Sequence, residues 1–350
     1  ILSYPRGGKS LLNGFYTFGP EETLNWFRER GLDFYTDEID CVFPVTDKSQ
    51  SVIDVLLKEA GKLGVQIWRD AGVEKIEPLD DGSFLLHLPN GNTIITPQLV
   101  MATGGNRQSM KMLSQLDIPI VDPVPSLFPF KLNNQWLAEY AGLSVEDCVV
   151  SIPNTKFTAS GTVLITHRGV SGPGVIRLSS WAARFLKEQD YCTPIHIDWL
   201  SGVGNQEKSL QTLKVWKDAH ATKQVTQQPV SPVFASRLWR GLCGQVPGLT
   251  RKRWADVSKS ELSRLNLVLR QLELNVIGRD QHKQEYVTCG GVDLKSVNLR
   301  SMESKRIPNL MFVGEVLDID GLTGGYNLQN CWTTGWLAGT HLAGDLLRYM

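Results

Sequence analysis

The 350-residue sequence lacks the short cysteine and glycine patterns that would assign a function at once. Its six cysteines include no C-x-x-C pair, which argues against a disulfide scaffold, a zinc ribbon and a dithiol redox centre. A G-x-G-x-x-G phosphate loop is absent as well, which argues against an independent dinucleotide site unless such a loop lies upstream of Ile1. The sequence therefore predicts no metal site.

The chain also lacks an excess of either charge and any long apolar run. Lysine plus arginine and aspartate plus glutamate number 36 each, and a neutral chain has no electrostatic footprint for nucleic acid or an anionic membrane. No apolar run approaches the length that crosses a bilayer. No signal peptide precedes the polar first segment, which starts at Ile1 as if the natural beginning were missing. We expect a cytoplasmic protein with a small-molecule substrate and without nucleic-acid or membrane partners.

What the sequence does contain is enough apolar material for buried cores. Hydrophobic residues make up 42% of the chain, and its length corresponds to two or three domains of roughly 150 residues. Prolines crowd residues 118–130, which prevents a regular helix and marks a crossover into a different region. We interpret residues 128–284 as an insertion between two halves of one nucleotide-binding domain, residues 1–127 and 285–350.

Hydrophobic periodicity and turn residues predict the elements of each part. In the first half we expect helices over residues 20–31 and 50–63 and strands over residues 65–68, 73–76, 83–88 and 98–102. In the insertion we expect strands over residues 148–152, 161–166 and 194–199, a helix near 175–187, and helices within 205–272, with a capping box at Ser258 and Glu261.

The acidic, glycine-rich stretch from Gly314 to Gln329 is the most informative part of the chain. An apolar run over residues 310–313 predicts a short buried strand that stops there, and a helical pattern follows the glycine pair. The glycines allow close approach of the backbone, and the helix start offers free N–H groups and a positive dipole end. This pattern predicts a cradle for a ligand with negative charge, such as a reduced flavin. A structural strand-to-helix turn is the alternative.

A second strand, over residues 98–102, ends in Thr103-Gly104-Gly105. Two strands of one sheet that end in such turns are expected where a dinucleotide lies across the carboxyl edge. Glu315 or Asp318 would then hydrogen-bond ribityl or ribose hydroxyls. Each of the two could equally be a solvated turn acid.

The sequence from Thr166 to Gly174 forms a second dense cluster, with Pro173 where a helix could begin. His167 could act as a general acid, because imidazole titrates near working pH. Arg168 could hold a carboxylate or phosphate. Both could instead be residues that position the loop.

Several motifs together resemble the BaiN-type flavoproteins, bacterial NAD(P)/FAD-dependent oxidoreductases of the glutathione-reductase-like Rossmann class. They span nearly the whole chain in the family's order: Tyr4-Pro5-Arg6-Gly7-Gly8-Lys9, Cys41-Val42-Phe43-Pro44, Ala102-Thr103-Gly104-Gly105, Pro125-Ser126-Leu127, residues 166–173, Thr288-Cys289-Gly290-Gly291-Val292, Met302-Glu303-Ser304-Lys305 and residues 314–329.

The resemblance implies an α/β, Rossmann-like FAD-binding domain interrupted by a β-barrel-like insert (residues 128–203 and 273–284) with a helical segment (residues 204–272). It places Val73 at adenine, and the helix start beside the isoalloxazine ring. The residues that it assigns to FAD are Val73, Ala102, Thr103, Gly104, Gly105, Gly314, Glu315, Asp318, Gly324, Gly325, Tyr326, Asn327 and Leu328.

The function implied by the resemblance is hydride transfer from NAD(P)H through FAD to a small unsaturated or carbonyl-containing substrate, with His167 as proton donor. The family usually begins with the phosphate loop that is absent here, so the alternative is a catalytically inactive or truncated binding module. A flavin-dependent tRNA modifier is a third hypothesis, which the neutral charge disfavours. The resemblance assigns neither the substrate, nor the choice between NADH and NADPH, nor an oligomeric state.

Overall fold

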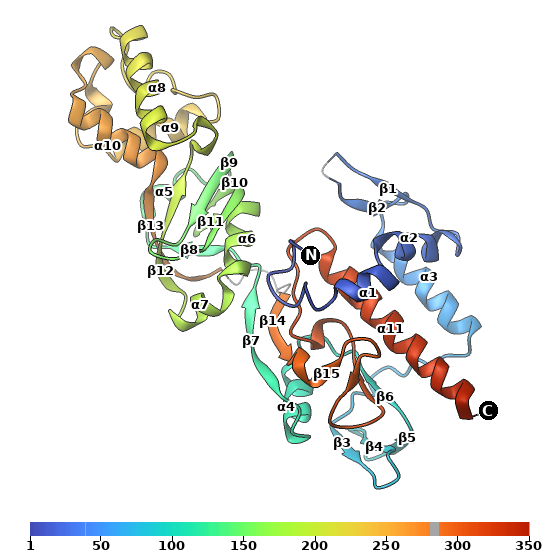
Figure 1. The fold of residues 1–350 in the computed structure, drawn as a ribbon. Coiled ribbons are helices and arrows are strands. Elements are labelled where there is room, and N and C mark those ends of the chain that lie inside the picture. Colours follow the sequence, from blue (N-terminus) through green and yellow to red (C-terminus); the bar gives the residue numbers. More distant parts are fainter. Residues whose placement is uncertain (39, 281–286, 350) are drawn as a thin grey trace. The chain divides into compact units, whose positions relative to one another are not determined.

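The chain folds into two compact units (Figure 1). A computed structural model describes residues 1–38, 40–280 and 287–349, with side chains in the last helix described as far as residue 344. Unit 1 comprises Ile1–Val124 and Val287–Met350, and unit 2 comprises Pro125–Tyr286. In the described part, no helix combines the length and the apolar character that a membrane crossing requires.

The centre of unit 1 is a 4-stranded sheet in the order β15-β16-β17-β6. Two neighbouring strands of this sheet, β6 (Leu99–Met101) and β17 (Leu310–Phe312), run parallel with Leu99 opposite Leu310. All three residues of β17 are buried, as the apolar run predicts. The sheet is completed by β15 (Val297–Asn298) and β16 (Glu303–Ser304), and a separate pair is formed by β7 (Ile120–Ser126) and β14 (Val287–Val292).

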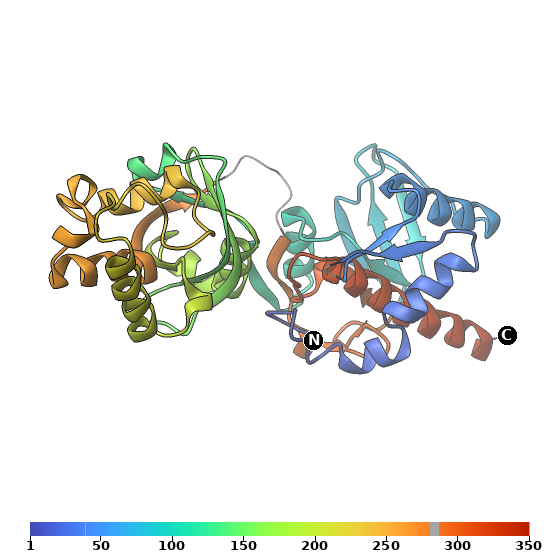
Figure 2. The same ribbon diagram turned by 90° about the horizontal axis from the view of Figure 1, so that it is seen from above.

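Helix α11 (Tyr326–Tyr349) begins shortly after β17. In Figures 1 and 2, α1 (Leu12–Thr17) and α2 (Pro20–Arg28) pack against it. The remaining elements of unit 1 are β1 (Phe34–Thr36), β2 (Val42–Pro44), α3 (Ser49–Lys62), β3 (Lys75–Pro78), β4 (Phe84–His87), β5 (Thr93–Thr96), α4 (Arg107–Gln115), η4 (Leu294–Ser296) and η5 (Gly314–Val316).

Two sequence expectations for unit 1 are wrong. Residues 65–68 form no strand, and Val65, Ile67 and Trp68 are more than half exposed. A β-rich run becomes a strand only when a neighbour pairs with it, and no described strand lies beside this one. The strand expected over residues 73–76 begins two residues later, at Lys75 of β3, so Val73 precedes the antiparallel meander β3-β4-β5.

Unit 2 contains a closed barrel in the order β10-β11-β8-β13-β12-β9. Six strands and three short helices surround its core: β8 (Phe130–Leu132), β9 (Ser144–Ser151), β10 (Thr158–Thr166), β11 (Gly169–Ser171), β12 (Cys192–Asp198), β13 (Leu272–Arg279), α5 (Gln135–Ala138), α6 (Pro173–Trp181) and α7 (Ala183–Glu188). The predicted helix over residues 175–187 is therefore two helices, because the backbone leaves helical geometry at Ala182.

A helical segment separates β12 from β13 (Figure 1). It comprises η1 (Ser201–Val203), α8 (Gln206–Ala219), α9 (Ser236–Gly244), η2 (Leu249–Arg251), η3 (Trp254–Asp256) and α10 (Lys259–Arg270). The predicted capping box opens α10, where Ser258 Oγ accepts from the N–H of Glu261. A mixed α/β unit and a closed barrel with an attached helical segment confirm the predicted fold class.

Candidate functional site

The structure brings the two glycine turns of unit 1 together at the carboxyl ends of β6 and β17. A Cβ atom at Gly104 would lie 3.9 Å from Oε2 of Glu315, and one at Gly105 would lie 2.2 Å from Oγ1 of Thr288. Gly105 must therefore remain glycine for the turn to close against Thr288. Ala102 and Thr103 are exposed at the same edge.

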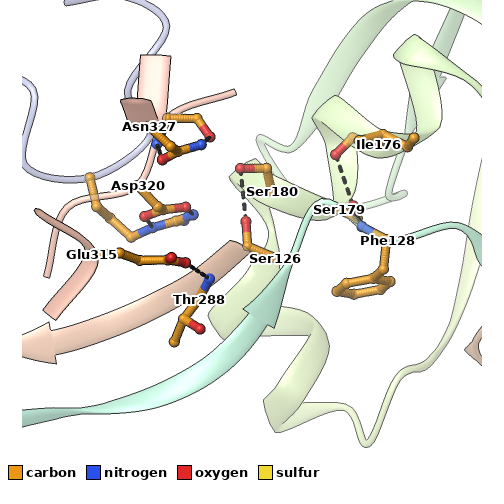
Figure 3. Close-up of polar contacts among 11 residues, drawn as sticks. Ser126, Phe128, Ile176, Ser179, Ser180, Thr288, Glu315, Asp320 and Asn327 are labelled. Carbon is orange, nitrogen blue, oxygen red and sulfur yellow. Dashed lines mark hydrogen bonds and ion pairs between the residues drawn. The ribbon is translucent and has the colours of Figure 1, made fainter. Parts of the chain in front are cut away.

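Glu315 holds a fixed position between these turns. Its Oε1 accepts from the N–H of Thr288 at 2.8 Å, as Figure 3 shows. Burial raises the pKa of Glu315 and the nearby charge of Asp320 raises it further, whereas the hydrogen bond from Thr288 opposes them. Oε2 points toward the turn at Gly104, so one oxygen is used within the protein and the other faces the turn of β6.

A buried ion pair that sequence reasoning missed fixes the loop after Glu315. Asp320 is fully buried, and both of its carboxylate oxygens accept from the guanidinium of Arg6. Gly7 has φ of 74°, and a Cβ atom there would lie 2.5 Å from Cγ1 of Ile319. The ion pair thus depends on a close backbone approach that glycine permits. Only the motif that contains Arg6 could have signalled it.

Two further contacts hold the loop that leads into α11. Tyr4 donates its hydroxyl hydrogen to the carbonyl oxygen of Tyr326 at 2.6 Å, and burial raises the pKa of Tyr4. The side chain of Asn327 accepts from the N–H of Gly321 at 2.8 Å and donates to its carbonyl oxygen at 3.0 Å. The start of α11 is therefore rigidly positioned relative to Asp320, which Figure 3 shows beside Asn327.

The first turn of α11 presents unpaired backbone donors. Counted from Tyr326, the first backbone N–H group of the helix with an acceptor is that of Gln329, which donates to the carbonyl oxygen of Gly325. The N–H groups of Tyr326, Asn327 and Leu328 have no acceptor among the described residues. Gly325 has φ of 85°, and a Cβ atom there would meet no atom within 4 Å. Space, free donors and the helix dipole together favour a group with negative charge.

Among the other predicted cofactor residues of unit 1, two use their backbone N–H groups within the protein and one is exposed. The N–H of Gly314 donates to Thr334 Oγ1 at 2.8 Å, so this buried glycine offers no free donor. Asp318 is half-buried, and its N–H donates to Val292 at 3.0 Å. Gly324 is exposed, with φ of 116°.

Two cavities of unit 1 contain predicted cofactor residues. A cavity of about 550 Å³ is lined by Gly324, Gly325, Tyr326 and Leu328. Another, of about 510 Å³, is lined by Val73, Thr103 and Asn106, among others. Thr103 and Tyr326 thus line two different cavities. Within the described residues, no group of three or more His, Cys, Asp or Glu side chains could hold a metal ion.

His167 and Arg168 lie in unit 2, in the turn between β10 and β11. Both are exposed, and Arg168 pairs with Asp280 at 3.3 Å. With Lys131, Asn134 and other residues they line a cavity of about 240 Å³. The predicted proton donor and the predicted cofactor residues thus belong to different units.

Comparison with known proteins places the chain among Rossmann-type proteins. The family described as "HI0933-like protein Rossmann domain" matches residues 1–341, which confirms the Rossmann-like class that the sequence predicts. The chain is 28% identical over 302 residues to the ribosomal RNA dihydrouridine synthase of Escherichia coli (strain K12), covering 83% of this chain and 71% of that protein.

Of two further relatives, one has the same name and the other a different one. The protein of Haemophilus influenzae with the same name, ribosomal RNA dihydrouridine synthase, is 25% identical over 324 residues, covering 88% of this chain and 76% of that protein. The 3-dehydro-bile acid delta(4,6)-reductase of Clostridium scindens is 25% identical over 333 residues, covering 92% of this chain and 80% of that protein.

Proposed function

Because the chain belongs to the HI0933-like Rossmann-domain family, we propose that it is a flavin-dependent oxidoreductase related to the BaiN type. The observation that supports this most is the first turn of α11, where three N–H groups have no acceptor among the described residues and the space beside Gly325 is open. FAD, when bound, would supply hydride transfer from NAD(P)H to the substrate. We propose that unit 1 is the FAD-binding part and that unit 2 is the inserted part.

The residues of unit 1 fit such a cofactor. The N–H groups of Tyr326, Asn327 and Leu328 would hold negative charge on the ring, because free donors at a helix start stabilise an anion. Tyr4 and the Arg6–Asp320 pair keep this turn in place without using those donors. The preorganised turn would therefore not have to reorganise when charge develops.

The carboxylates before α11 would bind the hydroxyl-bearing chain of the cofactor. Glu315 keeps one oxygen on Thr288 and turns the other toward Gly104, so that it would accept from a hydroxyl that lies along the β6 turn. Asp318 would do the same nearer the pyrophosphate. The cavity lined by Val73 and Thr103 would take the adenosine end.

His167 would protonate the substrate carbon, and Arg168 would hold a carboxylate or phosphate of the substrate. Exposure leaves the His167 imidazole free to reach a ligand. The alternative is that both residues only shape the β10–β11 turn and that the chain is an inactive binding module.

The substrate class follows from what the relatives' activities have in common. Uracil and an unsaturated steroid ketone both contain a carbon–carbon double bond conjugated with a carbonyl group. The names of the relatives concern the saturation of such bonds. We therefore propose a conjugated enone-like double bond as the reacting group. A uridine base in RNA is the second candidate, because two of the three relatives are named for ribosomal RNA.

The test is anaerobic turnover of the FAD-loaded protein with NADH or NADPH, and with a steroid enone, a cyclic enone or a uridine-containing RNA as acceptor. We expect oxidation of one reduced nicotinamide and saturation of one acceptor double bond, measured by absorbance and mass spectrometry. FAD-loaded protein that reduces none of these acceptors would contradict the proposal and favour the inactive binding module.

A further inference from the structure

The charge of the chain is unevenly distributed. The helical segment over residues 204–272 contains twelve lysines and arginines but only four aspartates and glutamates, a net charge of +8. Because the whole chain is neutral, the remaining residues carry a matching net charge of −8. The neutral total that argued against nucleic acid therefore conceals a strongly basic subdomain.

Most of this positive charge is available at the surface. Nine of the twelve basic side chains are exposed, and none of the nine forms an ion pair within the part of the chain that the structure describes. The three others serve the fold: Lys252 pairs with Glu261 at 2.8 Å, Arg270 pairs with Asp198 at 3.0 Å, and Lys217 donates to a backbone carbonyl.

Backbone pairing gathers part of the exposed charge at one place. The N–H of Trp254 donates to the carbonyl oxygen of Lys223 at 3.0 Å, and Gln224 forms a β-bridge with Arg253. Arg251 is the last residue of η2, two positions before Arg253. Lys223, Arg251 and Arg253 thus form an exposed basic cluster, which we call the 223–253 cluster.

Helix α9, which contacts η2, adds two further arginines. Arg237 and Arg240 are one turn apart on its exposed face, whereas Leu238, Trp239 and Leu242 fill the core. The buried face anchors α9 in the core, so its outer face presents both arginines to solvent.

The chemistry of this surface favours a phosphate backbone. Trp239 and Trp254 are buried and Trp216 stacks on His220, so these rings offer no platform on which bases could stack. The large exposed apolar side chains of the segment, Val215, Val233 and Leu267, lie on different elements, whereas a membrane-bound helix needs a continuous apolar face. Lysines and arginines without stacking partners contact phosphates independently of sequence.

We propose that the helical segment docks RNA through its phosphate backbone, with the 223–253 cluster as the main contact. This inference rests on the proposed function, since it assigns RNA as the partner that would bring a uridine to the flavin. It departs from our expectation of no nucleic-acid partner, which used the net charge of the whole chain. The segment would supply affinity and position, and the reductase site would supply selectivity.

The experiment titrates the full chain with a fluorescent RNA hairpin and measures the dissociation constant at several salt concentrations between about 50 and 200 mM. The variant K223Q/R251Q/R253Q removes the cluster. The control K58Q/K111Q/R300Q removes three exposed positive charges from unit 1. We expect the first triple variant to bind about tenfold more weakly, with a slope of log Kd against log salt shallower by about 2 to 3. We expect the control to match the unsubstituted chain.

A second variant, R237Q/R240Q, tests the same surface if the triple variant folds poorly, and it should weaken binding in the same direction. The proposal fails if the unsubstituted chain does not bind RNA, or if both triple variants lose affinity equally. It also fails if anionic phospholipid vesicles bind through the cluster and RNA does not. The titration needs no flavin and no nicotinamide, so the two proposals can fail separately. A chain that does not bind RNA can still be a reductase, and a chain without reductase turnover can still bind RNA.

Discussion

The two units of the molecule differ in how they bury apolar surface. Unit 2 has a closed barrel without free sheet edges, and its core includes fully buried tryptophans such as Trp199, Trp239 and Trp254. Unit 1 has open sheets, and β6 lies at the edge of the described 4-stranded sheet. Helix α3 has no buried residue, although its sequence predicts an apolar face. Unit 2 thus encloses its apolar core in a barrel, whereas unit 1 combines an apolar core of its own with polar loop contacts around the candidate site.

The largest effect is expected from breaking the buried ion pair of unit 1. Asp320→Ala leaves the Arg6 guanidinium without its carboxylate, and removing one partner of a buried pair costs about 3–5 kcal/mol. In calorimetry the transition of unit 1 should fall to lower temperature while that of unit 2 stays. Glu77→Gln, in an exposed pair with Lys75, is the control. A shift of both transitions would show that the units do not unfold separately.

The next effect concerns the proton donor proposed in unit 2. His167→Gln should lower kcat about 100-fold or more, because general acid catalysis contributes that much. It should not change FAD affinity, which depends on unit 1. His196→Gln, the same substitution in the barrel strand β12, is the control. Unchanged turnover in the His167 variant would remove this residue from the mechanism.

Alanine substitutions at two glycines with the same φ distinguish the effect of backbone strain from an effect on FAD binding. Gly325 and Gly31 both have φ of 85° and open space around a Cβ atom. Alanine at either position should cost about 1–2 kcal/mol of stability, because a left-handed backbone disfavours a side chain. Only Gly325→Ala should also weaken FAD binding, about tenfold or more, since its methyl group would enter the space before α11. FAD affinity is measured by fluorescence titration. Equal affinity in both variants would contradict the position of the isoalloxazine ring before α11.

The smallest effect is a pH dependence from Glu315. Burial raises its pKa in the folded chain above the ordinary value of 4.5, so the folded state binds more protons than the unfolded state. The stability of unit 1 should therefore fall as pH rises from about 4.5 through the raised pKa. In Glu315→Gln, whose amide oxygen can still accept from Thr288, this fall should diminish. An unchanged pH profile of the unit 1 transition would assign the titration to another group.

The parts of the fold that local signals determine were predictable. Ser258 and Glu261 define a helix start by themselves, and two glycine turns after parallel strands must meet at one sheet edge. Arg6 and Asp320 are 314 positions apart, and hydrophobic periodicity, a local signal, does not predict such a long-range contact. The run over residues 65–68 has strand character, but a strand requires a neighbour that local sequence does not specify. The roles of the individual site residues remain predictions.

The most direct test is a titration of the chain with FAD, followed by visible absorption and by calorimetry. The account predicts a shifted flavin spectrum and, at a hundredfold excess over the dissociation constant, stabilisation of unit 1 by about 2.7 kcal/mol. The transition of unit 2 should not move, and Gly325→Ala should reduce both signals. An unperturbed flavin spectrum with both transitions unchanged would contradict a flavin site at the start of α11.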